Sequence, residues 1–218
     1  MKHPLRYCAR VLVEAASPLK VGTGEKGLVA DELVALDANG LPFLPGSSLC
    51  GVLRHAFGSD ADKVFGYQGR GGDGGEGSRV AFSEGRLVGN DGTVLDGLAA
   101  VDFSDSFYSR LRSLSVRDHC RISRFGAADA EGYGKFDSQV VYKGCRFVFD
   151  VELIGDGGDS EVWKSLMALL SSPFFRIGGG TRKGFGELTV VGCEEKAFDL
   201  RDSKMRPEYL GRSSRLSV

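Results

Sequence analysis

Residues 7–15, YCARVLVEA, decide the fold of this chain. Every second residue of the stretch is apolar: Tyr7, Ala9, Val11, Val13 and Ala15. This spacing of two is typical of a β-strand that buries one face and leaves the other for polar groups. The stretch therefore predicts a strand, and with it a sheet that covers a hydrophobic core.

Two later segments have the spacing of amphipathic helices. The first is expected at residues 47–57, with Ser47 or Gly46 as its N-cap. The second is expected at residues 161–170. Apolar residues gather on one side of each, at Leu49, Val52, Leu53 and Ala56 in the first and at Val162, Leu166, Leu169 and Leu170 in the second. We expect both helices to pack on the same sheet.

Short apolar runs predict further strands at residues 33–36, 79–82, 86–88, 145–153 and 185–191, while residues 106–113 are ambiguous. The order is then strand, helix, strands, insertion, strand, helix and strand. It predicts an α+β fold with a ferredoxin-like, RRM-like split βαβ core, because two helices are too few for a doubly wound sheet. The sheet face or edge away from the helices would be open to a ligand, as in RRM-type proteins that bind single-stranded RNA.

The length of 218 residues suits one domain that carries large insertions. Its 32 glycines are about twice the usual share and concentrate in loops. We assign one domain to residues 1–198, with a glycine-rich loop region at about 58–78 and an extended insertion at about 117–139. Residues 199–218 are expected to form a polar C-terminal tail.

The charge is nearly balanced but unevenly distributed. A net charge of −1 argues against a protein that coats nucleic acid through bulk charge. Residues 110–146, however, hold eight basic residues against four acids, and residues 176–186 hold three basic residues and no acid. A basic strip on a neutral body is able to follow a phosphate backbone.

The five cysteines are scattered and form no CxxC pair, so we expect neither a disulfide framework nor a zinc site. The N-terminal residues contain no apolar run before a small-residue cleavage site, so we expect no signal peptide. No apolar stretch approaches the roughly 20 residues of a membrane helix. We therefore expect a cytoplasmic protein without a membrane partner.

The stretch LPGSSLCGVLR, residues 44–54, is the first candidate binding motif. Its Pro-Gly turn leads into a helix whose first N–H groups attract anions, so Ser47 and Ser48 are candidate phosphate contacts. Arg54 lies near two turns further on and is able to pair with a second phosphate or with a carboxylate. The alternative is an ordinary capped helix.

The second candidate motif is IGGGTRKGFG, residues 177–186. Its glycines, Gly179 and Gly180 among them, would let the backbone approach a ligand closely, and Arg182 and Lys183 add positive charge at the same point. It is not a Walker A loop, because Lys183 precedes its glycine and no Ser or Thr follows. The alternative is a tight turn between a helix and a strand.

Together the two motifs resemble those of the RAMP superfamily of CRISPR proteins. LPGSSLCGVLR resembles the family pattern IPGSSL-K-G-x-L/M-R, with Cys50 where the family commonly has lysine, and GGGTRKGFG resembles its glycine-rich signature. Residues 64–66 with 79–82, and residues 120–149, resemble two further family segments, so the resemblance covers about residues 7–192. It looks closest to the repeated backbone subunit of Csm- and Cmr-type, that is type III, effector complexes.

This resemblance implies a guide-binding role. In the family the insertion forms a thumb-like hairpin that wedges into the duplex of guide and target, and residues 120–139 are the matching stretch here. Arg121 and Arg124 would contact the RNA backbone, and Phe125 or Tyr133 would stack on a base. The alternative is a surface loop without such a role.

The resemblance also implies catalysis. Backbone subunits of this family cut target RNA with an aspartate in the loop before the PGSS helix, and Asp31 has the matching position, with Glu32 as the runner-up. The aspartate would position a hydrated Mg²⁺ ion or orient the ribose 2′-OH toward the scissile phosphate. We therefore expect a metal-dependent endoribonuclease that is active in the assembled complex.

The expected partners are guide crRNA, complementary target RNA, further copies of this chain and other CRISPR effector subunits. One alternative is a non-catalytic structural or capping subunit of the same complex. A second is a guide-processing endoribonuclease, for which His55 is the candidate because related endonucleases often use a histidine. The last is a standalone RRM-like protein that binds single-stranded RNA.

Overall fold

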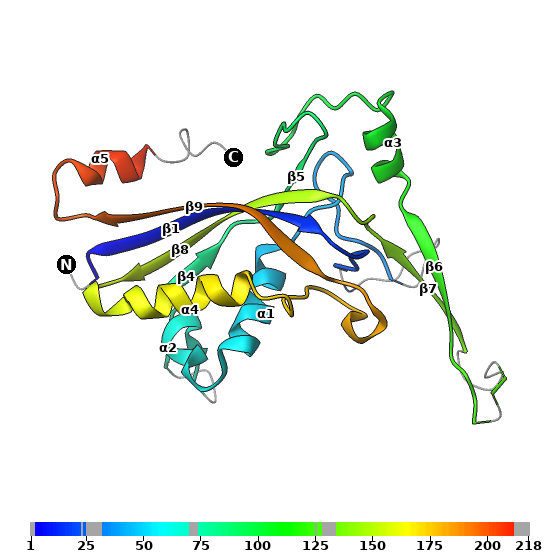
Figure 1. The fold of residues 1–218 in the computed structure, drawn as a ribbon, viewed down its shortest axis with the longest axis horizontal. Helices are drawn as coiled ribbons and strands as arrows, with labels where there is room; N and C mark the ends of the chain where they lie inside the picture. Colours follow the sequence, from blue (N-terminus) through cyan, green and yellow to red (C-terminus); the bar gives the residue numbers. More distant parts are fainter. Residues whose placement is uncertain are drawn as a thin grey trace.

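The computed structural model describes residues 3–22, 24, 32–69, 74–124, 126–127 and 134–211. Its centre is an antiparallel sheet in the order β4-β8-β1-β9, and β5 pairs with β8 next to β4 (Figure 1). The strands of this sheet are β1 (Leu5–Ala15), β4 (Val80–Phe82), β5 (Arg86–Val88), β8 (Arg146–Gly155) and β9 (Leu188–Asp199). The predicted mixture of helices with an antiparallel sheet is confirmed.

Strand β1 lies inside the sheet, because it pairs antiparallel with a neighbour along each edge. Leu5 lies opposite Gly155 of β8 and Asp199 of β9, and Glu14 lies opposite Arg146 and Thr189. All five apolar residues of the predicted alternation are buried. A slip by one residue would turn this apolar set to the other face, so the alternation sets the register.

Three helices cover one face of the sheet: α1 (Gly46–Phe57), α2 (Ala61–Phe65) and α4 (Ser160–Leu170) (Figure 1). The Trp163 ring of α4 stacks on the Tyr7 ring of β1 with 6.0 Å between centroids. Buried leucines of both long helices complete the core, at Leu49, Leu53, Leu166 and Leu170. The two predicted helices are therefore confirmed.

Helix α1 begins one residue earlier than expected. Its N-cap is Pro45, not Gly46 or Ser47, and no side chain caps it. Gly46 is required for packing: a Cβ atom there would lie 2.7 Å from the carbonyl oxygen of Phe82 and 2.9 Å from that of Ser83. The Pro-Gly pair thus lets the start of α1 lie directly against the end of β4.

Strand β9 is longer than the predicted strand at residues 185–191. Its second half, residues 192–197, is mostly exposed and carries charge, which hides it from a hydrophobic pattern. It remains a strand because the N-terminal half of β1 offers it backbone partners as far as Asp199. Backbone pairing with β1, and not the side chains of residues 192–197, makes this segment a strand.

The predicted polar tail contains structure as far as the description reaches. Helix α5 (Met205–Leu210) folds back along the sheet, and the Tyr209 hydroxyl donates to Glu152 of β8 over 2.7 Å. The Tyr209 ring also meets the buried Phe198 ring edge-on at 5.7 Å. The rest of the expected tail, residues 212–218, lies outside the described residues.

The sheet face opposite the helices carries ion pairs. Arg10 of β1 and Arg86 of β5 both pair with Asp150 of β8, at 2.8 Å and 2.9 Å. Arg6 approaches Glu152 at 3.5 Å on the same face. We predicted that a face or edge of the sheet is open to a ligand. In the described part of the chain, this face instead carries paired charges, and α5 lies along part of it.

A long hairpin projects from one end of the sheet (Figure 1). Its strands β6 (Ser115–Cys120) and β7 (Lys135–Val140) pair antiparallel, slightly beyond the expected 117–139 at both ends. The ambiguous segment before it is helix α3 (Ser106–Arg112), whose first turn is capped by the Asp105 carboxylate. Strands β2 (Tyr67–Gln68) and β3 (Gly75–Glu76) pair within the glycine-rich loop region, whose residues 70–73 are not described.

No helix in the described ranges combines the length and the apolar character that crossing a membrane requires.

Two glycine substitutions in α1 test the packing of its first turn. Gly51 is an exposed helix position where a Cβ would meet nothing within 4 Å, so Gly51→Ala should raise the free energy of unfolding by about 1 kcal/mol. Gly46→Ala should lower it by about 1–3 kcal/mol, because the new methyl group collides with the β4 backbone. Urea unfolding of the purified chain measures both. Equal effects of the two substitutions would contradict the proposed contact.

Candidate nucleic-acid interface

Three segments that are distant in the sequence meet at the end of the sheet where the hairpin begins. The first segment follows β1 and comprises residues 19–22 and 32–34. The second is strand β7, and the third is the glycine-rich loop before β9, residues 177–186. Backbone hydrogen bonds of 2.7–3.2 Å join them, from the amides of Leu19, Glu32, Gln139, Val141 and Gly179 to the carbonyls of Val141, Asp137, Glu32, Leu19 and Lys20. The glycine-rich loop and the insertion predicted from sequence are thus parts of one surface.

The glycines of the loop make room for this chain's own groups. A Cβ at Gly178 would lie 2.2 Å from the carbonyl oxygen of Lys20, and one at Gly179 would lie 2.7 Å from Cε of the same lysine. A Cβ at Gly180, which has a φ of 74°, would lie 2.6 Å from the Phe185 ring. Internal packing therefore requires these glycines, and the predicted RNA contacts of Gly179 and Gly180 stay predictions.

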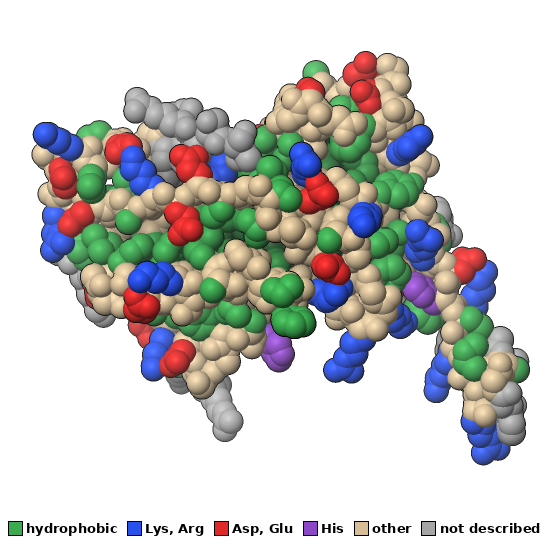
Figure 2. Space-filling view, viewed as in Figure 1, with side chains coloured by type: hydrophobic (Ala, Val, Ile, Leu, Met, Phe, Trp, Pro, Cys, Tyr) green, Lys and Arg blue, Asp and Glu red, His purple; other side chains and the backbone are tan. Residues whose placement is uncertain are grey.

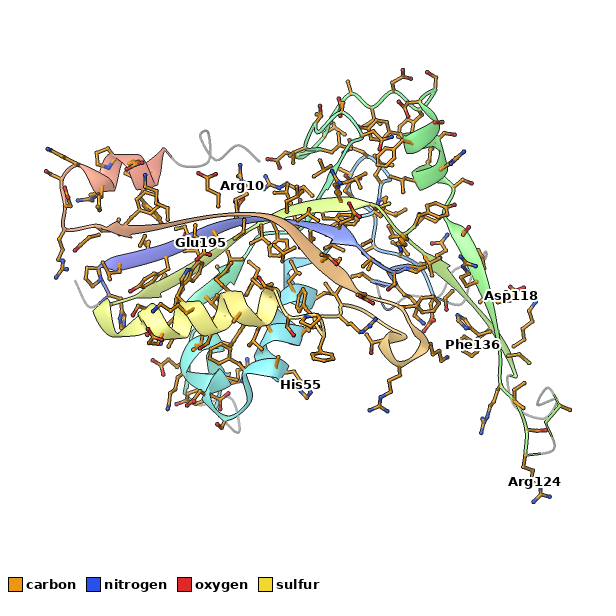
Figure 3. The ribbon with its side chains drawn as sticks, in the orientation of Figure 1. Arg10, His55, Asp118, Arg124, Phe136 and Glu195 are labelled. Carbon is orange, nitrogen blue, oxygen red and sulfur yellow. The ribbon has the colours of Figure 1, made fainter. Side chains whose placement is uncertain are left out.

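Four side chains bind the loop to the hairpin near the outer end of its paired strands, and we call them the aromatic joint: His119, Phe136, Lys183 and Phe185. The His119 ring stacks on Phe136 with 4.8 Å between centroids and an interplanar angle of 18°. Phe185 of the loop meets His119 edge-on at 5.9 Å, and the ammonium group of Lys183 lies 4.7 Å from the Phe136 centroid. Figure 3 shows Phe136 partway along the hairpin, between the sheet and Arg124. The joint fastens the glycine-rich loop to the paired strands of the hairpin.

A polar cluster lies beside this joint. The ammonium group of Lys20, on a side chain that is 14% exposed, forms an ion pair with the carboxylate of Glu32. The fully buried Ser138 of β7 donates its hydroxyl to the same carboxylate over 2.5 Å. Burial works against the charge of Glu32, yet the hydrogen bonds from Lys20 and Ser138, with the charges of Lys20 and His119, lower its pKa below the ordinary value. Glu32 is therefore a fixed, ionised carboxylate.

Exposed basic residues surround the joint and follow the hairpin outward (Figure 2). The predicted residues Arg182 and Lys183 lie on the loop, and Arg121 and Arg124 lie beyond β6, with Arg124 far out on the hairpin in Figure 3. Sequence reasoning missed Arg117, which pairs across the hairpin with Ser138. Arg117 lies two residues before His119, and alternate residues of a strand point to the same face. The strand alternation would therefore have placed Arg117 on the same face of the hairpin as the joint.

The helix α1 motif has a different setting. Ser47 is exposed and Ser48 is half-buried at the start of α1. Arg54 donates to the carbonyl oxygen of Gly66 and pairs with Asp62, so it ties α1 to α2. Of the two partners expected for Arg54, a carboxylate is the one it contacts.

Two predicted residues lie outside the described part of the chain: Asp31, the catalytic candidate, and Phe125, the stacking candidate, as does the alternative Tyr133. The neighbour Glu32 is described. His55, the candidate of the processing alternative, is exposed at the end of α1, on a different element from the hairpin (Figure 3).

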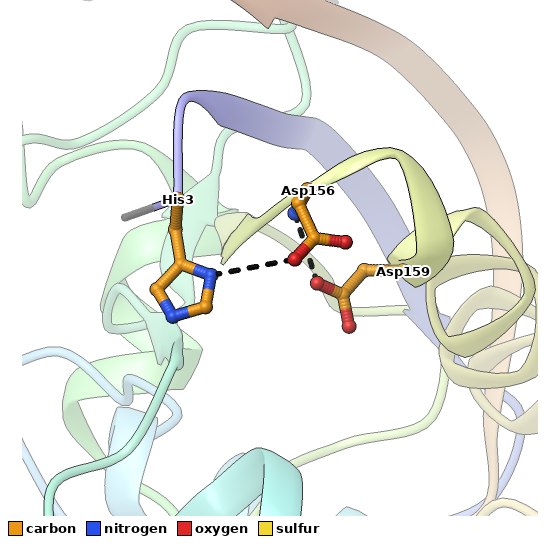
Figure 4. A group of neighbouring side chains, drawn as sticks. All are labelled: His3, Asp156 and Asp159. Carbon is orange, nitrogen blue, oxygen red and sulfur yellow. Dashed lines mark hydrogen bonds and ion pairs between the residues drawn. The ribbon is translucent and has the colours of Figure 1, made fainter. Parts of the chain in front are cut away.

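One group of possible metal ligands stands close together in the described residues: His3, Asp156 and Asp159, whose ligand atoms lie within 4.8 Å of one another (Figure 4). Asp159 is already bound, because its carboxylate accepts from Arg79 and from the Asp156 amide, each over 2.9 Å. Asp156 in turn caps the turn before α4 by accepting from the amide of Gly158. The group is explained as the anchor of α4.

These features define the class as an α+β protein with a central antiparallel sheet and a basic hairpin inserted before β8. The chain belongs to the RAMP superfamily, because the sequence model of that family matches residues 12–189. No curated protein sequence matches the chain. The family match spans the end of β1, both candidate motifs and the hairpin.

Two solved structures share the fold. A chain of the type III-B Cmr-beta complex bound to cognate target RNA has a TM-score of 0.57 at 13% identity, over 87% of this chain and 60% of that one. A chain of type III-B Cmr-beta in the apo state has a TM-score of 0.56 at 16% identity, over 84% of this chain and 97% of that one. This chain thus spans 60% of the length of the first. At these identities the likeness concerns the fold.

Phe136→Leu should loosen the hairpin while leaving the sheet intact. The substitution removes a ring stack and a cation–π contact, worth together about 1–2 kcal/mol. Hydrogen exchange of the β6 and β7 amides should therefore accelerate by roughly tenfold or more, with unchanged exchange in β1 and β8. Val116→Ala on the opposite face of the hairpin is the matched control. Similar acceleration in both variants would show that the joint does not hold the hairpin.

Proposed function

We propose that this chain is a crRNA-binding backbone subunit of a type III CRISPR effector complex that cleaves paired target RNA at regular intervals. One observation carries the proposal: the aromatic joint unites the glycine-rich loop and the basic hairpin. Two motifs suspected separately of contacting RNA therefore lie on one surface that carries exposed basic residues. The family membership and the shared fold with a chain of an RNA-bound type III-B complex support the same role.

The topology supports the finer description of the fold. The order β4-β8-β1-β9, with α1 after β1 and α4 after β8, is the arrangement that a split βαβ, ferredoxin-like core requires. In this proposal the β6–β7 hairpin is the thumb that enters the duplex of guide and target. Its reach beyond the sheet and its exposed arginines suit that task (Figure 2).

The chain would recognise RNA by its backbone and shape, while base pairing reads the sequence. Arg182 and Lys183 would hold guide phosphates near the joint, and Ser47 and Ser48 would add contacts at the start of α1. Arg121 and Arg124 would follow the duplex along the hairpin, and Phe125 would stack on a displaced base. Further copies of the chain and other effector subunits would complete the assembly in the cytoplasm.

Cleavage is assigned to Asp31 together with Mg²⁺. Magnesium commonly binds one or two carboxylates and completes its shell with substrate phosphate oxygens and water, so a single aspartate beside the scissile phosphate is sufficient. The described neighbour Glu32 is held by Lys20 and Ser138, and Asp31 is therefore the residue we assign to the ion. The ion would stabilise developing charge on the phosphate, and Asp31 would orient it or the 2′-OH.

The second candidate is a non-catalytic structural or capping subunit of the same complex. The observation that favours it is that Glu32, the carboxylate described beside Asp31, is committed to an ion pair. Such a subunit would keep the joint and the basic hairpin and would not depend on Asp31. A guide-processing endoribonuclease has less support, because His55 lies on α1 and is not part of the joint.

Asp31→Ala in the assembled complex separates these candidates. With guide-matched RNA and magnesium, the wild-type complex should cut at regular intervals, and the variant should cut at least about 100-fold more slowly. Guide binding should stay unchanged, and removal of magnesium should mimic the variant. Asp91→Ala, which removes a loop carboxylate bonded to Thr93, is the matched control. Undiminished cutting by Asp31→Ala would establish the structural role.

A further inference from the structure

A cavity lies at the root of the hairpin, between α3 and the turn that joins β7 to β8 (Figure 1). Its volume is about 590 Å³, within the range of about 300–1,000 Å³ that is usual for small-molecule sites. Its lining comes from Asn90 after β5, from α3 and from residues 142–145. None of these residues belongs to the glycine-rich loop or to the paired strands β6 and β7, so the cavity is separate from the aromatic joint.

One part of the lining is apolar and aromatic. Leu111 of α3 and Cys145 are buried, whereas Phe107 and Tyr142 are half-buried and present aromatic side chains to the cavity. Aromatic side chains stack on planar groups, and every nucleobase offers such a face. This part of the cavity therefore suits a base.

The other part of the lining is cationic, and no carboxylate lines the cavity. Arg110 of α3 and Lys143 of the turn are exposed, and neither forms an ion pair or a side-chain hydrogen bond with another described residue. The acid that precedes α3, Asp105, is engaged as its cap and accepts from the Phe107 amide over 2.6 Å. A phosphate group at this place would meet two cations that have no other partner in the described chain.

We propose that this cavity binds a single nucleotide, with its phosphate between Arg110 and Lys143 and its base against Phe107 and Tyr142. The exposed amide of Asn90, which offers two donors and one acceptor, contacts the base edge or the ribose. The same groups recognise a free nucleotide and a nucleotide within an RNA strand. The inference goes beyond the proposed function and does not rest on it, because the cavity shares no residue with the aromatic joint.

Titration of the purified full chain with uridine monophosphate, followed by the NMR shifts of its amides, tests the site. The amides of residues 107–111 and 142–145 should shift along one saturable curve. Arg110→Gln and Lys143→Gln should each raise the Kd by at least about fivefold, because each removes a charged partner of the phosphate. Arg112→Gln is the matched control on α3 and should stay within about twofold, since the Arg112 guanidinium lies 4.7 Å from the Phe103 centroid. Equal weakening by Arg112→Gln, or no saturable shift at these amides, would overturn the proposal.

Inorganic phosphate and uridine test the two halves of the ligand separately. Each should bind at least about tenfold more weakly than uridine monophosphate, because each engages one part of the lining. Phe107→Leu should weaken the nucleotide by at least about threefold and leave inorganic phosphate unchanged, which also shows that the variant is folded. Phosphate that binds as tightly as the nucleotide would make this an adventitious anion site only and would overturn the proposal.

Hexauridylate distinguishes the two sources of the nucleotide. If it displaces uridine monophosphate from the same amides with at least about tenfold higher affinity, and Arg110→Gln weakens it, the occupant is part of an RNA strand. Displacement without a gain in affinity assigns the cavity to a free nucleotide. A chain that responds to neither ligand at these amides, and whose self-association changes in Arg110→Gln, would have a second copy in the cavity, which would overturn the proposal. That result leaves the proposed function standing, because the joint lies elsewhere.

Discussion

The antiparallel pairing of β1 with both β8 and β9 is the constraint on which the rest of the structure depends. Because both neighbours run opposite to β1, the end of β1 lies beside the starts of β8 and β9. The segment after β1, the hairpin before β8 and the glycine-rich loop before β9 therefore reach the same end of the sheet. Side chains of these three segments are therefore close enough to contact one another, as Lys183 contacts Phe136 and Lys20 contacts Glu32.

This arrangement moves the proposed RNA surface from the face of the sheet to its end. RRM-type sheets bind single-stranded RNA through exposed aromatic rings on the open face. Here the described residues of that face form ion pairs centred on Asp150, and α5 lies along part of it. If Arg10 and Arg86 turned to RNA, Asp150 would lose its ion pairs. The desolvation cost of its carboxylate would then no longer be offset. The arginines of the basic hairpin, by contrast, are exposed.

Local patterns predicted what local physics decides. The alternation in residues 7–15 predicted the central strand, and apolar spacing predicted both long helices, because burial on a single face leaves a period in the sequence. The second half of β9 and α5 escaped prediction, since pairing with β1 and docking of Tyr209 hold them in place. Both candidate motifs were found, but their physical roles were not. Ser138 lies 106 residues after Glu32 and 118 after Lys20, so no local pattern predicts their cluster. Asp31 and Phe125 stay predictions.

The central claim is that RNA lies on the surface shared by the glycine-rich loop and the hairpin, and photocrosslinking tests it most directly. Guide RNA carrying photoreactive bases would be crosslinked in the complete effector complex, and the attached peptides identified by mass spectrometry. The account predicts crosslinks within residues 177–186 and within the β6–β7 hairpin, and none at Arg10 or Arg86. Crosslinks concentrated on the ion-paired sheet face, with the hairpin unlabelled, would contradict it.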